Sequence, residues 1–111
     1  MKKFVLFCDL KDDAILIEEY KKHHKSVWPE VIKSIKNSGI ETMEIYNNGN
    51  RLFMIIEAND TFSFEVKAKN DASNINVQAW EDLMWKYQQK IPWAKEGEKW
   101  LLLEQIFKLN Q

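Results

Sequence analysis

The pattern of apolar and polar positions predicts three strands in the first half of the chain. Residues 4–8 form a short continuous apolar run, which is typical of a strand buried on both faces. Residues 41–46 alternate as a second strand, and residues 51–58 follow as the other arm of a hairpin. Asn48-Gly49, between the two arms, is the strongest hairpin signal in the sequence. Three apolar residues share one face of the second arm: Leu52, Met54 and Ile56.

Two helices are predicted between the first strand and the hairpin. Asp12 or Asp13 can cap the first helix, because a short carboxylate accepts hydrogen bonds from the unpaired amides at a helix start. Pro29 ends that helix or starts the next one, since proline fits the first helical turn. Ser38-Gly39 then closes the second helix.

Two more helices and a strand are predicted after the hairpin. Asp60-Thr61 opens a short helix that carries Phe62, and the helix after it ends at Pro92. That later helix has four apolar residues at helical spacing: Val77, Trp80, Met84 and Tyr87. After a charged loop, residues 100–109 are predicted to form the last strand.

This order of elements predicts an α+β, ferredoxin-like fold. It divides into two similar halves, each made of a strand, a helical crossover and a strand. The expected result is an antiparallel sheet covered by helices on one face. The uncovered face needs a partner, and a second copy of the chain, giving a homodimer, is the obvious one. Candidate sheet positions, without assignment to a face, are Phe4, Leu6, Phe53, Ile55, Leu102 and Ile106.

Length and composition predict one domain over residues 1–111 in a reduced, cytoplasmic setting. Apolar residues make up 45% of the chain, which is an ordinary globular balance. The net charge of -1 argues against a nucleic-acid partner. No stretch approaches the ~18 apolar residues of a membrane span. Cys8 is the single cysteine, so a disulfide framework and a cysteine-based metal site are both excluded.

The residues that could carry chemistry gather before Pro29. No glycine-rich phosphate loop is present, and His23 and His24 are adjacent, so on a helix they point about 100° apart and cannot readily share a metal ion. We therefore expect no metal and no cofactor. Tyr20, His24 and Trp28 lie four residues apart, which would stack them along one helix face. Histidine titrates near neutral pH and can both take and give a proton.

The same segment resembles a known family. Residues 18–30 are similar to the E-E-Y-x-x-x-H-x-x-x-W-P-E signature of the L-rhamnose mutarotases. The resemblance continues over nearly the whole chain, through Ser38-Gly39 and residues 44–46, 52–57, 78–80 and 103–107. It implies a ferredoxin-like dimer with an exchanged strand, which interconverts the α and β anomers of a monosaccharide without a cofactor.

The resemblance also implies site residues. The tyrosine and histidine of the motif correspond to Tyr20 and His24, with the histidine as proton donor, and Trp28 belongs to the same motif. A later tryptophan pair contacts the sugar in the family, and its first member matches Trp80. Aromatic faces pack well against the apolar C–H faces of sugars, so the five tryptophans of this chain suit a carbohydrate cleft.

Two positions depart from the family pattern. The second member of the tryptophan pair is Glu81 here, and Met43 stands where the family has a tyrosine, although Tyr46 nearby is kept. A site that hydrogen-bonds a hydroxyl strongly rejects the wrong substrate, so exchanges at such positions alter preference. L-Rhamnose and L-fucose are both candidate substrates, and we expect L-fucose to be accepted as well as L-rhamnose or better.

Two other functions fit the same fold. Small ferredoxin-like dimers include cofactor-free monooxygenases and non-catalytic ligand-binding modules, and a fold alone does not select among them. A monooxygenase would consume oxygen and form a new product. A binding module would take up a sugar and leave the exchange of its anomers unchanged.

Overall fold

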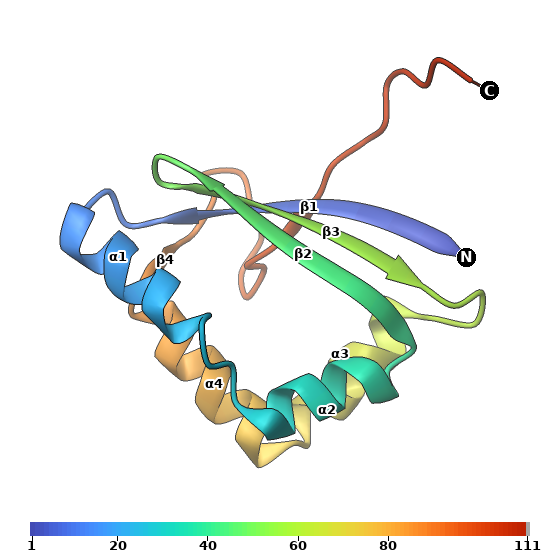
Figure 1. Cartoon of the computed structure of the whole chain (residues 1–111), viewed down its shortest axis with the longest axis horizontal. Coiled ribbons are helices and arrows are strands. Elements are labelled where there is room, and N and C mark those ends of the chain that lie inside the picture. Colours follow the sequence, from blue (N-terminus) through green and yellow to red (C-terminus); the bar gives the residue numbers. More distant parts are fainter. Residues whose placement is uncertain (111) are drawn as a thin grey trace.

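In the computed structural model, which describes residues 1–110, one antiparallel sheet carries all four helices on a single face (Figure 1). The elements in chain order are β1 (Lys2–Leu10), α1 (Ala14–His23), α2 (Pro29–Asn37), β2 (Ile40–Asn48), β3 (Arg51–Ala58), α3 (Phe64–Ala72), α4 (Ile75–Trp85), β4 (Gln88–Gln89) and β5 (Leu101–Leu102). The predicted α+β, ferredoxin-like architecture is confirmed. No helix in this part of the chain is both long and apolar enough to cross a membrane.

The strand order places β1 inside the sheet. The order is β2-β3-β1-β4, and β5 also pairs with β1. In the register, Cys8 lies opposite Leu52 and Phe7 lies opposite Phe53. Because side chains alternate between the faces of a strand, Cys8 and Leu52 face the helices, whereas Phe7 and Phe53 face away from them. The apolar run at the start of the chain is therefore buried on both faces, as predicted.

The predicted boundaries in the first half agree with the structure. The Asp13 side chain caps α1 by accepting hydrogen bonds from the amides of Ile15 at 2.9 Å and Leu16 at 3.1 Å. Pro29 is the first residue of α2. Gly39 ends the turn after α2 at a φ of 99°, and a Cβ there would meet the Asn59 side chain at 2.8 Å. A residue with a side chain would be strained at this position.

The helices of the second half differ from the prediction at their ends. Ser63, not Asp60-Thr61, caps α3, so Phe62 lies before the helix, where its ring packs 5.8 Å from that of Phe4. The prediction that α4 runs to Pro92 is wrong, because the helix ends at Trp85. The backbone then pairs with β1 in a two-residue strand, and this tertiary pairing overrides the helical pattern that ran through Tyr87.

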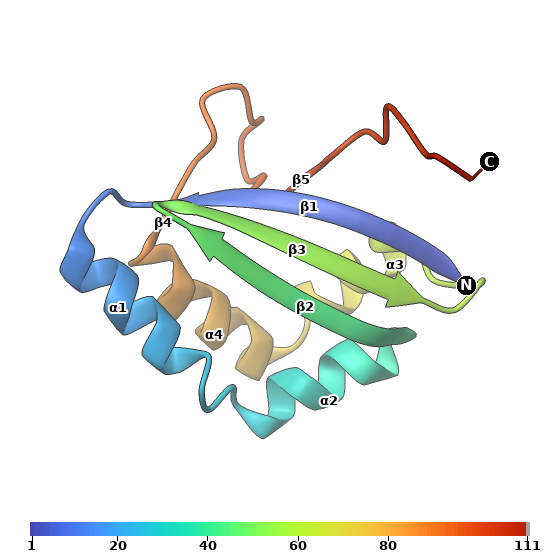
Figure 2. The same cartoon turned by 45° about the horizontal axis from the view of Figure 1, so that its top comes forward.

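The predicted last strand is much shorter in the structure. Only Leu101–Leu102 pairs with β1, although the Leu103 amide also donates to the Val5 carbonyl at 2.8 Å. Residues 103–110 then run away from the body of the molecule without regular structure (Figure 2). This segment, called the tail below, carries four exposed apolar residues: Leu103, Ile106, Phe107 and Leu109. The sequence pattern of a strand continues through the tail, but among residues 1–110 only the Leu103 amide extends the pairing with β1.

Apolar clusters lie on both faces of the sheet. Two are on the helix side, one around Tyr20 and Trp80 and the other around Phe62. Of the candidate sheet positions, Phe4 and Leu6 belong to the second of these clusters, whereas Phe53 packs on the opposite face. There Phe7, Ile91 and Ala94 form a small third cluster. The face opposite the helices is therefore partly covered by the chain itself.

Candidate active site

The C-terminal end of α1 brings Tyr20 and His24 together. Tyr20 is only 3% exposed, and its ring centroid lies 4.3 Å from that of His24. His24 is the residue that caps the helix, and its Nδ1 lies 3.0 Å from the carbonyl oxygen of Tyr20. A carbonyl oxygen only accepts, so Nδ1 carries the hydrogen and the neutral ring keeps its lone pair on Nε2. The helix end thus fixes which nitrogen can take up a proton.

The surroundings set the protonation of both groups near neutral pH. Burial lowers the pKa of His24, the hydrogen bond to the Tyr20 carbonyl opposes this, and the neighbouring His23 lowers it further. Burial also raises the pKa of the Tyr20 hydroxyl. Both shifts follow the rule that a low-dielectric environment disfavours the charged form of a group. The site therefore presents a neutral imidazole beside a protonated phenol.

Trp80 and Trp28 complete an aromatic cluster with these two residues. The Trp80 ring lies 5.6 Å from that of His24 at 70°, and 5.1 Å from that of Trp28 at 72°. Both contacts are edge-to-face, which is a favoured arrangement of aromatic rings. Trp80 comes from α4 and is 8% exposed, whereas Trp28 immediately precedes α2. The four side chains, Tyr20, His24, Trp28 and Trp80, are called the aromatic cluster below.

The predicted stacking along one helix face is found for Tyr20 and His24 but not for His24 and Trp28. The His24 amide still bonds to the Tyr20 carbonyl at 3.4 Å, so the spacing of four acts as it does in a helix. The helix ends at His23, however, and the chain turns before Trp28. The prediction that Trp28 shares a helix face with His24 is therefore wrong. Trp28 reaches the cluster through its contact with Trp80 instead.

Of three other predicted site residues, two lie apart from the aromatic cluster and the third adjoins Trp80. Met43 is half-buried and packs in the apolar cluster around Phe62. Tyr46 is 52% exposed on the face of the sheet opposite the helices, where its hydroxyl donates to a Glu44 carboxylate oxygen at 2.9 Å. Glu81 follows Trp80 on α4 and is half-buried. Their part in sugar binding stays a prediction.

A second histidine–tyrosine pair was not predicted from the sequence. His23 Nε2 lies 3.1 Å from the Tyr87 hydroxyl, and the ring of Tyr87 meets that of Tyr20 at 6.3 Å. The neighbouring Gln88 is also buried, at 3% exposed. Sequence reasoning placed both Tyr87 and Gln88 in a continuous helix. A strand of two residues leaves no periodic signal by which to recognise it.

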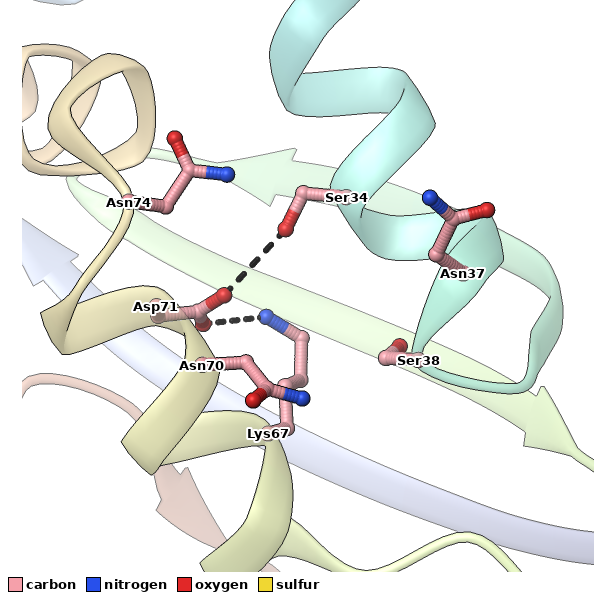
Figure 3. Close-up of a pocket in the computed structure, with 7 residues that line it drawn as sticks. All are labelled: Ser34, Asn37, Ser38, Lys67, Asn70, Asp71 and Asn74. Carbon is pink, nitrogen blue, oxygen red and sulfur yellow. Dashed lines mark hydrogen bonds and ion pairs between the residues drawn. The ribbon is translucent and has the colours of Figure 1, made fainter.

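A hollow in another part of the molecule does not include any residue of the aromatic cluster. This hollow, of about 220 Å³, lies between α2 and α3 (Figure 3). Its Lys67 and Asp71 pair with each other, and the Ser34 hydroxyl donates to Asp71 at 3.3 Å. Its charged groups therefore already have partners. Among residues 1–110, no three His, Cys, Asp or Glu side chains gather closely enough to hold a metal ion.

Known proteins resemble this chain over most or part of its length. The family model described as L-rhamnose mutarotase matches residues 3–109. An L-fucose mutarotase from Xanthomonas campestris pv. campestris is 39% identical, with 100% of this chain and 90% of that protein aligned. An L-rhamnose mutarotase from Clostridium beijerinckii is 35% identical over 50% of this chain and 55% of its own length.

A solved structure has the same fold. The crystal structure of an L-rhamnose mutarotase from Formosa agariphila superimposes with a TM-score of 0.73 at 21% sequence identity. The alignment covers 98% of this chain and 99% of that one. Together with the full-length sequence matches, this shows that the chain belongs to the L-rhamnose mutarotase family of carbohydrate isomerases.

Proposed function

We propose that this enzyme interconverts the α and β anomers of a 6-deoxy-L-hexose, with His24 as the acid–base group. The observation that carries the proposal is the hydrogen bond between His24 Nδ1 and the Tyr20 carbonyl at 3.0 Å. It directs the basic Nε2 of a neutral imidazole away from the helix end. Burial lowers the pKa of His24, so the base form prevails at neutral pH.

One group can move the proton that ring opening requires. The anomeric oxygen and the ring oxygen of the sugar are bonded to the same carbon. His24 Nε2 takes the proton of the anomeric hydroxyl and delivers it to the ring oxygen. As it does so, the bond from the anomeric carbon to the ring oxygen breaks with its electron pair, and a carbonyl forms at the anomeric carbon. Rotation of the aldehyde and reversal of these transfers give the other anomer, and the enzyme returns to its starting state.

In this proposal Tyr20 and Trp80 hold the sugar in place beside His24. Burial raises the pKa of Tyr20, so its hydroxyl keeps its proton and acts as a hydrogen-bonding group for the sugar. Trp80 lies against His24 and gives the sugar an apolar wall. The backbone of both residues belongs to regular helices, which hold them more rigidly than loops would.

The comparisons favour L-fucose as a substrate. The Xanthomonas protein named as an L-fucose mutarotase aligns with all of this chain, whereas the Clostridium protein named as an L-rhamnose mutarotase aligns with half of it. Met43 and Glu81 replace a tyrosine and a tryptophan of the family pattern. These exchanges remove a hydroxyl and an aromatic ring from positions implied in sugar recognition. We infer that L-fucose is accepted as well as L-rhamnose or better.

Saturation-transfer NMR on both free sugars tests the proposal, because it detects exchange between anomers directly. We expect added protein to accelerate exchange of L-fucose at least as much as that of L-rhamnose. Exchange at the spontaneous rate for both sugars would refute the proposed activity. A strong preference for L-rhamnose would refute only the substrate, and would show that Met43 and Glu81 lie outside the specificity contacts.

We further propose that the enzyme is a homodimer in which the tail pairs with a second copy. Ile106 is 89% exposed and Phe107 is 72% exposed, in a segment that has the sequence pattern of a strand. Exposed apolar side chains on an unpaired extended segment favour pairing with another chain. The family resemblance implies the same exchange of a strand.

A further inference from the structure

Gln88 is a buried polar residue whose hydrogen bonding is incomplete. It lies in β4 opposite Leu10 of β1 and is 3% exposed. Its carboxamide oxygen is fully buried, yet no group among residues 1–110 donates a hydrogen bond to it. Buried polar atoms are almost always paired, because leaving one unpaired costs its lost hydration. An exception of this kind points to a ligand or another missing donor.

The carboxamide lies beside the proposed catalytic pair. Leu10, its partner in the register, belongs to the same apolar cluster as Tyr20 and Trp80, so the Gln88 side chain is on the helix side of the sheet. Gln88 is close enough to interact with the Tyr20 hydroxyl, where it opposes the larger effect of burial on the pKa of that group. The side chain thus lies on the same side of the sheet as Tyr20 and Trp80.

We propose that Gln88 is a sugar-binding residue, with one end of its carboxamide toward the Tyr20 hydroxyl and the other bonded to a hydroxyl of the substrate. This inference rests on the proposed function and adds a specificity contact to it. A carboxamide has a donor end and an acceptor end, and a sugar hydroxyl both donates and accepts. Either orientation of the amide therefore leaves a group that a hydroxyl can satisfy.

A structural role and a binding role for Gln88 predict different effects on stability. A glutamine that holds the fold together would be fully hydrogen-bonded, and its loss would clearly lower the melting temperature. A glutamine whose carboxamide oxygen is unpaired in the free protein destabilises that protein, as groups at functional sites commonly do. Replacing it with an apolar residue of similar shape removes this cost but also removes the contact with the Tyr20 hydroxyl, so the melting temperature should change little.

The test compares Gln88→Met with the matched control Gln89→Met, because Gln89 is the exposed neighbour on the same strand. Saturation-transfer NMR over a series of L-fucose concentrations gives the half-saturating concentration, and thermal unfolding gives the melting temperature. We expect Gln88→Met to raise the half-saturating concentration about tenfold, which corresponds to one lost hydrogen bond. We expect its melting temperature to change little, and Gln89→Met to change neither quantity.

Gln88→Asn provides a second variant, since it keeps the amide but withdraws it by one methylene, and it should also weaken saturation. Wild-type half-saturation in both folded variants would overturn the inference, as would a lowered melting temperature without any change in saturation. In either case normal exchange by the wild-type enzyme would leave the proposed function intact. Wild-type protein that leaves exchange at the spontaneous rate would instead overturn the proposed function and this inference together.

Discussion

Replacing His24 should remove most of the anomer exchange while the fold survives. His24→Ala deletes the proposed acid–base group, and removal of such a group costs ~10²-fold or more in rate. That loss corresponds to about 2.7 kcal/mol in the activation barrier. His24→Asn is the sharper variant, because its side-chain amide can still donate to the Tyr20 carbonyl that His24 Nδ1 contacts at 3.0 Å. It keeps the hydrogen bond at the helix end and cannot carry the proton.

His23→Ala is the matched control. His23 is adjacent in sequence, but its Nε2 lies 3.1 Å from the Tyr87 hydroxyl. Losing that bond leaves a largely buried hydroxyl less well paired, which costs about 1 kcal/mol of folding stability. We therefore expect His23→Ala to lower the melting temperature modestly and to keep most of the exchange rate. The two histidines would then separate a catalytic effect from a structural one.

Saturation-transfer NMR gives the exchange rate of each variant, and circular dichroism shows that each remains folded. Near-normal exchange in folded His24→Ala and His24→Asn would refute the acid–base assignment. Equal losses in the His23 and His24 variants would show that the rate depends on the packing of this helix end and not on one ring nitrogen. The family membership would stand in either case, because it rests on the sequence matches.

Four further predictions concern pH, Tyr20 and the assembly of the enzyme. Burial lowers the pKa of His24 below its ordinary value of 6.5, so kcat/KM, measured by exchange over a pH series, should fall in acid with a midpoint below 6.5. In the unfolded chain His24 has its ordinary pKa, so it binds a proton at a higher pH than in the folded protein. Folding stability should therefore decline as the pH falls from 6.5 toward the lower pKa of folded His24. Denaturant titrations over this range should show a weaker decline for His24→Asn, which has no imidazole to protonate. Tyr20→Phe, assayed by the same exchange measurement, should lose less rate than His24→Asn, since a single proton carrier suffices, and an equal loss would show that the phenol also transfers a proton. Light scattering at micromolar concentration should show a dimer, and removal of residues 103–111 should give a monomer; a clean monomer of the intact chain would contradict the proposed exchange of the tail.

Local signals in the sequence were sufficient to predict the first half of the fold. The Asp13 cap, Pro29 at the start of a helix and the positive φ of Gly39 each depend on a few adjacent residues. The contact between Tyr20 and His24 is also local, because it follows from their spacing of four residues at the end of one helix. The contact of Trp80 with His24 joins α4 to the end of α1, and no spacing in the sequence encodes it. Trp80 was found instead through the family resemblance.

Tertiary pairing determines the elements that sequence reasoning missed. Tyr87 and Gln88 continue a helical pattern, but Tyr87 lies in a turn and Gln88 pairs with Leu10 in β4, which carries a polar side chain into the interior. The position of Gln88 beside Tyr20 therefore depends on the pairing of β4 with β1, which the sequence pattern does not indicate. Composition would have placed the same residue on the surface, because glutamine is mostly exposed in proteins.

In the tail, the sequence predicts a longer strand than the structure contains. Its pattern predicts a strand over residues 100–109, yet only Leu101–Leu102 pairs within the chain, and Ile106 remains 89% exposed. Strand patterns favour pairing and burial of apolar side chains, and among residues 1–110 the tail achieves little of either beyond the Leu103 amide. This mismatch supports the proposal that a second copy of the enzyme pairs with the tail. In such a pair the exposed residues would complete the strand that the sequence predicts.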